Sequence, residues 1–264
     1  MSHDPDFKEI LNTIDTRYRK HVDSFRSPDG SLAELLELKD LHTARVVENI
    51  LEIASRHAPD RFISFCCAAS ARLHDVGRFE QLRSYGTFRD SDSIDHALLS
   101  RRIVEREKWL DGVPGAECIL DAVLFHNRRE LPPELDDATL FVSNAVRDAD
   151  KLDIFTVLED RVKNTDWRKD CSAFWNLPVS APPNPTVVET IRSGRSVDYR
   201  DIKSLSDFVL IQVGWMIEGL HFAATRRMCK ERGHLEFRRQ FLGQISGDSA
   251  ALGLCDLAAA ALTR

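Results

Sequence analysis

The chain has 264 residues, a formal net charge of −6 and 43% hydrophobic residues. This length suffices for one large hydrophobic core, because domains reach roughly 250 residues before they tend to split. Nucleic-acid-binding proteins usually present a basic face or stripe to phosphates, and the acidic balance of this chain does not suggest one. We therefore expect no nucleic-acid partner.

The amino terminus and the apolar stretches give no targeting or membrane signal. MSHDPDFKEI lacks a basic segment followed by an apolar one, and the longest uncharged stretch, FVLIQVGWMI, is too short to cross a bilayer. The six cysteines include no CxxC pair, and Cys66 and Cys67 lie in an apolar run where we expect reduced thiols. These features predict a cytoplasmic protein that does not enter a membrane.

The first three predicted helices place a histidine on one helix and a His-Asp pair at the end of another. Residues 7–25 carry apolar side chains at helical spacing and precede the turn SPDGS. In LKDLHTARVVENILEIA the same spacing puts His42 on one face of an amphipathic helix. The run RFISFCCAASARL predicts a buried helix that ends at His74 and Asp75, with Gly77 as its stop.

Later segments continue the helical pattern. His96 opens the helix predicted in SIDHALLSRRIVEREKWL, His126 closes CILDAVLFHN, and Asp150 closes LFVSNAVRDADKL. Residues 177–185 hold four of the ten prolines and predict a loop, and one long helix is expected from residue 201 to about 233. Sustained strand alternation is absent, so the predicted fold class is all-α.

The ordered histidines and aspartates predict a metal centre. Neutral imidazoles and carboxylates bind divalent transition metals, and the spacings would let several helices deliver them to one point. Four neutral histidines and two carboxylates carry two negative charges against the four positive charges of two divalent ions. A hydroxide and an anionic substrate would neutralise the remainder, and Asp75 can bridge both ions through its two oxygens. The candidate ligands are His42, His74, Asp75, His96, His126 and Asp150.

The order H…HD…H…H…D resembles the HD-domain superfamily of metal-dependent phosphohydrolases, an all-helical fold named after the dipeptide. LHTARVVENI, ARLHDVGRFEQ, SIDHALLS, LFHN and RDADKLDIF are similar to its successive motifs. The resemblance implies two divalent ions of Mn, Fe, Co, Ni or Zn, because the chain has a minimal one-metal set plus the two histidines of the two-metal subgroup. The minimal set is His42, His74, Asp75 and Asp150, and the additional histidines are His96 and His126.

The resemblance covers about residues 31–160, and we expect one domain over residues 1–264. In it, an HD-type helical bundle carries additional N- and C-terminal helices, with residues 1–30 and 161–264 packed on the core. Two branches of the superfamily are not matched. Arg78 replaces the lysine usual in the HD-GYP branch, and LPPELDD replaces its GYP segment, while HDVGRF departs from the HDxxED pattern of guanosine-tetraphosphate hydrolases.

Basic and aromatic residues near the ligands are candidates for substrate contacts. Arginine can bind a phosphate through two parallel hydrogen bonds, and lysine provides a point charge. The loop RSYGTFRDSD joins two ligand-bearing helices, so it should pass near the metals. We expect Asp75, Arg78 and Lys151 to be catalytic. The candidate substrate-binding residues are Arg45, Arg78, Tyr85, Phe88, Arg128 and Lys151.

The favoured function is phosphohydrolysis of a small phosphorylated metabolite or nucleotide through a metal-activated hydroxide. A second hypothesis is a diiron oxygenase of the same superfamily, similar to myo-inositol oxygenase, because imidazoles and carboxylates also suit iron. A third hypothesis is a non-catalytic, metal-dependent ligand sensor. The oligomeric state is left open.

Overall fold

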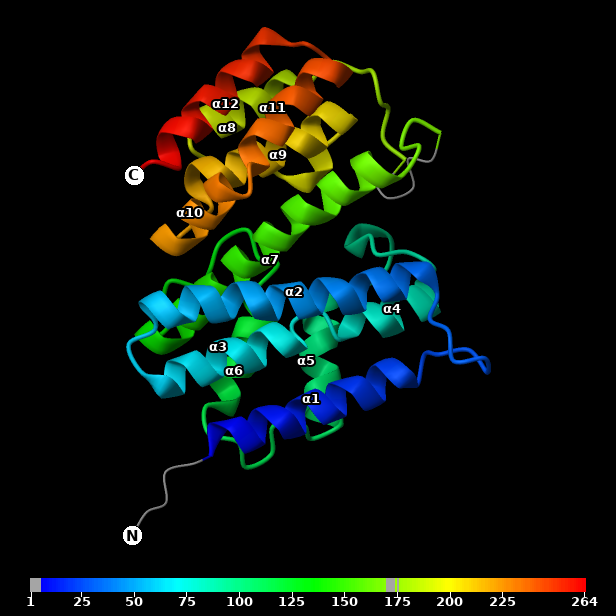
Figure 1. Ribbon diagram of the computed structural model, residues 1–264, viewed down its shortest axis with the longest axis vertical. Helices are drawn as coiled ribbons and strands as arrows, with labels where there is room; N and C mark the ends of the chain where they lie inside the picture. Colours follow the sequence, from blue (N-terminus) through cyan, green and yellow to red (C-terminus); the bar gives the residue numbers. More distant parts are fainter. Residues whose placement is uncertain (1–5, 170–173, 175) are drawn as a thin grey trace. The chain divides into compact units, whose positions relative to one another are not determined.

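The computed structural model describes residues 6–169, 174 and 176–264. All regular elements within these residues are helices, which confirms the predicted all-α class (Figure 1). No described helix is long and apolar enough to span a lipid bilayer. The elements are α1 (Phe7–Asp23), α2 (Glu34–His57), α3 (Arg61–Leu73), α4 (Gly77–Tyr85), η1 (Asp90–Asp92), α5 (His96–Arg106), α6 (Ala116–Phe125), α7 (Asp137–Asn164), α8 (Pro185–Arg192), η3 (Tyr199–Asp201), α9 (Leu205–Glu218), α10 (Ala223–Glu231), α11 (His234–Ile245) and α12 (Ser249–Ala261).

The chain forms two compact units, residues 1–150 and 151–264, and α7 contributes residues to both. In the first unit, α3 contacts α1, α2 and α6, while α5 contacts α4 and α6. In the second, α9 contacts α8, α11 and α12. The expectation of one domain in which the C-terminal helices pack on the HD-type core stays a prediction.

Helices α2 and α3 form the centre of the first unit. The buried face of α2 contains His42, Val46, Ile50 and Ile53, which recur every three or four residues. Nine of the thirteen residues of α3 are buried, many of them small, so neighbouring helices can pack against more than one of its faces. The sequence pattern therefore places one ligand histidine on the same helix face as the hydrophobic core.

Gly77 begins a helix and does not end one. Helix α3 ends at Leu73, and Gly77 is the first residue of α4. A Cβ atom at Gly77 would lie 2.7 Å from the backbone nitrogen of Ser100 and 2.8 Å from the carbonyl oxygen of His96. The glycine therefore allows the start of α4 to approach the first turns of α5, which carries His96.

Asp150 also lies in the middle of a helix, contrary to the prediction that it ends one. Helix α7 continues to Asn164 because Leu152, Phe155 and Leu158 extend its buried face beyond the aspartate. On α2, Asn49 Nδ2 donates a hydrogen bond of 3.1 Å to the carbonyl oxygen of Ala149. This bond holds the turn that carries Asp150 against the helix that carries His42.

The long helix predicted for residues 201–233 is wrong, because α9 and α10 are separate. Helix α9 starts with a capping box between Ser204 and Asp207 and ends before Gly219. The carbonyl oxygen of Gly219 accepts a 2.6 Å hydrogen bond from Lys151 Nζ, so it is satisfied without a further helical turn. The proline-rich loop is confirmed, and Pro185 occupies the first turn of α8, where its missing N–H costs nothing.

A buried charged network lies within the core of the second unit. Arg238 is 0% exposed, and its guanidinium donates to Glu159 Oε1 at 2.9 Å, Gln212 Oε1 at 2.8 Å and the carbonyl oxygen of Phe155 at 2.9 Å. His234 Nδ1 lies 2.6 Å from the same Glu159 oxygen. Burial lowers the pKa of Arg238 to about 10, so the guanidinium remains charged at neutral pH. The network joins α7, α9 and α11.

Replacing this guanidinium should destabilise the protein much more than replacing its exposed neighbour. Arg238→Met leaves the Glu159 carboxylate buried without its main cation, which should cost about 3–5 kcal/mol. Arg239→Met removes an exposed ion pair with Asp256, of 2.8 Å, and should cost at most about 1 kcal/mol. Urea denaturation of the two variants measures the difference, and equal losses would refute a stabilising role for the buried network.

Candidate metal centre

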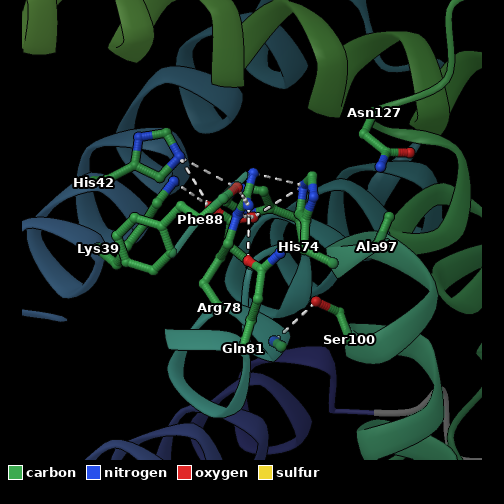
Figure 2. A network of polar contacts seen from close by, with 12 residues as sticks. Lys39, His42, His74, Arg78, Gln81, Phe88, Ala97, Ser100 and Asn127 are labelled. Atoms are coloured by element: carbon green, nitrogen blue, oxygen red, sulfur yellow. Dashed lines mark hydrogen bonds and ion pairs between the residues drawn. The ribbon is translucent and has the colours of Figure 1, made fainter. Parts of the chain in front are cut away.

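Six side chains from five helices or their ends converge in the first unit, and Figure 2 shows part of the arrangement. Five of the six residues are at most 5% exposed, and the side chain of Asp150 is 17% exposed. Two ligands follow the end of α3, one follows α6, one begins α5, and α2 and α7 each contribute one. These are the six residues predicted as ligands: His74 and Asp75, His126, His96, His42 and Asp150.

The first cluster consists of two imidazoles and two carboxylates. His42 Nε2 lies 3.3 Å from His74 Nε2, 3.5 Å from Asp75 Oδ2 and 3.1 Å from Asp150 Oδ1. His74 Nε2 lies 3.6 Å from Asp75 Oδ2 and 3.9 Å from Asp150 Oδ1. Ligand atoms bound at about 2.1 Å to a common ion stand roughly 3.0–3.4 Å apart, so these separations approach those of a coordination shell.

The second cluster uses the other oxygen of the same aspartate. Asp75 Oδ1 lies 3.5 Å from His96 Nε2 and 3.7 Å from His126 Nε2, and the two nitrogens are 3.0 Å apart. One carboxylate thus faces two imidazole pairs, one pair through each oxygen. This is the arrangement expected of a ligand that bridges two ions.

Hydrogen bonds on the far side of the rings determine which ring nitrogen faces the centre. His74 and His126 each approach the carbonyl oxygen of the residue three positions earlier through Nδ1, at 2.8 and 2.7 Å. His96 Nδ1 lies 2.6 Å from Asp90 Oδ2. Carbonyl and carboxylate oxygens only accept, so each Nδ1 carries the hydrogen and each neutral ring directs the lone pair of Nε2 to the centre.

These donors fit a cation. The Nε2 atoms of His96 and His126 face each other at 3.0 Å with lone pairs that repel unless positive charge lies between them. Asp75 Oδ1 is buried and accepts no hydrogen bond from a described residue, although Arg78 Nε lies 3.4 Å from it. A buried carboxylate oxygen without a donor is costly unless a cation neutralises it. The chemistry of the donor set, imidazole with carboxylate, suits a divalent transition metal.

The electrostatic environment keeps the imidazoles of His74 and His96 neutral and the carboxylates of Asp75 and Asp150 charged. Burial lowers the pKa of His74 to about 3, and burial together with Arg78 lowers the pKa of His96 to about 4. Burial alone would raise the pKa of Asp75, but the adjacent cations Lys39 and Arg78 hold it well below its usual range. Burial also acts to raise the pKa of Asp150, but the contact with His42 outweighs it and holds this pKa below its usual range. These are the protonation states that metal ligands require.

The sequence analysis did not identify three residues that shape this centre. Lys39 Nζ lies 2.8 Å from Asp75 Oδ2, and its position one helical turn before His42 was the available signal. Asp90, and not Asp95, contacts the ring of His96, while Asp95 Oδ1 caps α5. Gln81 Nε2 donates to Asp90 Oδ1 at 2.9 Å, which helps to position the carboxylate behind the imidazole.

Arg78 is at the centre, and both of its terminal nitrogens contact acceptors of the chain. Nη1 approaches Gln81 Oε1 at 2.8 Å, the carbonyl oxygen of Phe88 at 2.6 Å and Asp90 Oδ1 at 3.1 Å. Nη2 donates to His96 Nε2 at 3.2 Å, and Nε lies 3.4 Å from Asp75 Oδ1. The guanidinium therefore ties the loop after α4 to both the ligands and their supporting residues.

Phe88 lies between two cations. The centre of its ring is 5.6 Å from Lys39 Nζ and 5.7 Å from the guanidinium carbon of Arg78, and Figure 2 shows the ring beside Lys39. Both distances are within the range of cation–π attraction. Through Phe88, the loop after α4 thus contacts two cations that lie beside Asp75.

The remaining predicted substrate residues have other surroundings. Tyr85 is 51% exposed at the end of α4, and Arg45 is half-buried one turn after His42 on α2. Arg128 Nη2 lies 3.4 Å from Asp95 Oδ2, with 46% of its side chain exposed. Lys151 donates to the carbonyl oxygen of Gly219 in the second unit. Contact of these four residues with a substrate stays a prediction.

Comparison with known families agrees with this geometry. Residues 40–154 match the family model described as HD domain, and this range contains all six converging side chains. No curated protein and no solved structure gives a significant match. Residues 40–154 are therefore similar to the HD domain, and the all-α fold and the converging His and Asp side chains of this segment agree with that match.

Proposed function

We propose that this protein is a metal-dependent phosphohydrolase that acts on a small phosphorylated metabolite or nucleotide. The observation that supports this most directly is the position of Asp75, which faces a histidine pair through each carboxylate oxygen. Paired ions about 3.5–4 Å apart are typical of enzymes that hydrolyse phosphate esters. In this proposal the six converging side chains hold two divalent ions.

Each protein group has a separate task in this mechanism. Bound divalent ions supply Lewis acidity and make water a nucleophile near neutral pH. Asp75 faces one cluster through each of its carboxylate oxygens, so the two clusters share its single negative charge. Asp90 holds the His96 ring with Nε2 inward, and Arg78 anchors Asp90 and the loop that carries Phe88. Burial of the ligands limits competing contacts with bulk water.

The charge balance favours an anionic substrate. Six ligands with two ionised carboxylates leave a surplus of positive charge when two divalent ions are bound. Lys39 and Arg78 add further positive charge within contact distance of Asp75. A phosphoryl group, whose charge increases at the oxygens during in-line transfer, is stabilised by such a site.

Hydrolysis should depend on divalent metal and on the His-Asp pair. A panel of phosphomonoesters, phosphodiesters and nucleotides is incubated with the protein and with Mn²⁺, Fe²⁺, Co²⁺, Ni²⁺ or Zn²⁺, and phosphate or nucleoside release is measured. His74→Ala should reduce kcat/KM by more than the roughly 10- to 100-fold typical for loss of a residue that only orients a ligand. Asp92→Asn, in an exposed ion pair of the neighbouring loop, is the matched control and should retain activity.

A different result would favour the second hypothesis. Oxygen consumption by the iron-loaded protein, with no turnover of any phosphate ester under any metal, would reject phosphohydrolysis and support a diiron oxygenase. Binding of metal without either activity would support a sensor.

Removal of one histidine of the second cluster should halve the metal content. His126→Ala takes away one of the three side chains that surround that position, while the first cluster keeps all four. Elemental analysis of protein loaded and then desalted should show a change from about two ions per chain toward one. Retention of two ions by the folded variant would refute the assignment of His126.

The Phe88 ring should affect substrate binding more than metal binding. Phe88→Ala removes the wall beside Lys39 and Arg78 but no metal ligand, so KM should rise several-fold while metal content stays constant. Leu41→Ala, at a position of α2 that is 53% exposed, controls for a loss of apolar volume. An unchanged KM would remove the loop after α4 from the substrate site.

A further inference from the structure

Lys39 and Arg78 both contact Asp75, but they differ in how many hydrogen bonds they make within the chain. Arg78 contacts four acceptors of the chain through Nη1 and Nη2, its Nε is buried without a hydrogen-bond partner among the described residues, and its side chain is only 14% exposed. To bind a phosphate through Nη1, its guanidinium would have to release the carbonyl oxygen of Phe88 or the carboxylate of Asp90. Arg78 is therefore a positioning residue, although arginine is usually the better phosphate ligand.

Lys39 has donors to spare. An ammonium group carries three N–H donors, and among the described residues Lys39 Nζ donates to one acceptor, Asp75 Oδ2, at 2.8 Å. Its side chain is 18% exposed, so part of it remains accessible to a ligand. A compact ammonium can turn about its terminal bond and redirect its hydrogens without a change in the backbone.

Lys39 also competes with a metal ion for one oxygen. Asp75 Oδ2 faces His42 and His74 at 3.5 and 3.6 Å, and it is the oxygen that the ammonium contacts. A divalent ion and an ammonium on one carboxylate oxygen repel each other strongly in a buried site. An anion that contacts both cations removes this repulsion, because each then has negative charge beside it.

On this basis we infer that Lys39 binds the anionic group of the substrate and couples anion binding to metal binding. This inference rests on the proposed function, because the anion is taken to be a phosphate or phosphate ester. Phe88 borders the ammonium on one side, and the ring restricts where the anion approaches. The role that the sequence analysis assigned to Arg78 thus passes to a residue on α2.

The coupling predicts two changes in Mn²⁺ affinity, and both can be measured without substrate turnover. Lys39→Met keeps much of the side-chain length and removes the charge. Without an anion, the variant should bind Mn²⁺ more tightly than the wild type, because no ammonium competes for Asp75. With inorganic phosphate, the wild type should gain Mn²⁺ affinity by roughly 5- to 150-fold, the usual range of coupling between two ligands, and the variant should gain little.

Isothermal titration of Mn²⁺ into the full chain, with and without inorganic phosphate, measures both effects. Lys20→Met removes an exposed lysine from α1 and controls for net charge, and Lys39→Arg should preserve the coupling. Thermal unfolding checks that each variant is folded. Phosphate coupling in Lys39→Met equal to that of the wild type, or no coupling in the wild type, would overturn the inference.

The test is separate from that of the proposed function. Loss of coupling in Lys39→Met, with no phosphate ester turned over by the wild type, would retain the anion site and reject the phosphohydrolase. Turnover of a phosphate ester by the wild type, with the same phosphate coupling in Lys39→Met as in the wild type, would support the phosphohydrolase and reject the anion site at Lys39.

Discussion

Two pairs of imidazole nitrogens facing one carboxylate constrain the rest of this centre. His96 and His126 approach within 3.0 Å, a distance at which unprotonated nitrogens repel, and His42 and His74 approach within 3.3 Å. Burial prevents protonation of His74 and His96 near neutral pH, so the repulsion is not relieved by uptake of a proton there. Positive charge between the rings relieves it, and the oxygens of Asp75 supply the matching negative charge.

Helix ends allow this crowding without distortion of the helices. His74 and His126 follow the last residues of α3 and α6, so their backbone positions remain close to helical while their Nδ1–H groups satisfy carbonyl oxygens that a helix end would otherwise leave open. The same bond orients the ring and stabilises the helix terminus. His96 begins α5 and has no such carbonyl, and Asp90 takes that role.

The two cations beside Asp75 differ in how firmly the chain holds them. Arg78 is held by four acceptors and acts on the ligands, whereas Lys39 makes one hydrogen bond to the chain and stands beside the ring of Phe88. A fixed guanidinium adds to the field at no cost of reorganisation, and a mobile ammonium can follow the charge of a ligand. This division explains how two cations beside one carboxylate can have different functions.

By itself, the sequence determined the all-α class, the helix that presents His42, the helix ends at His74 and His126, and the identity of the six converging side chains. Hydrophobic periodicity and the order of metal-ligand residues are local properties, so they can be read along the chain. The extent of α7 beyond Asp150 and the break at Gly219 were not predictable in this way, because burial and a hydrogen bond from Lys151 decide them.

The tertiary structure alone decided which of the two cations makes fewer hydrogen bonds to the chain. Arg78 and Lys39 are both basic residues within one turn of a ligand, and nothing local distinguishes their roles. Their hydrogen-bond partners come from Phe88 and Asp90 in one case and from Asp75 in the other, across up to 36 residues of chain. The acceptors packed around an N–H donor decide whether that donor is already hydrogen-bonded within the chain. The whole unit determines this packing.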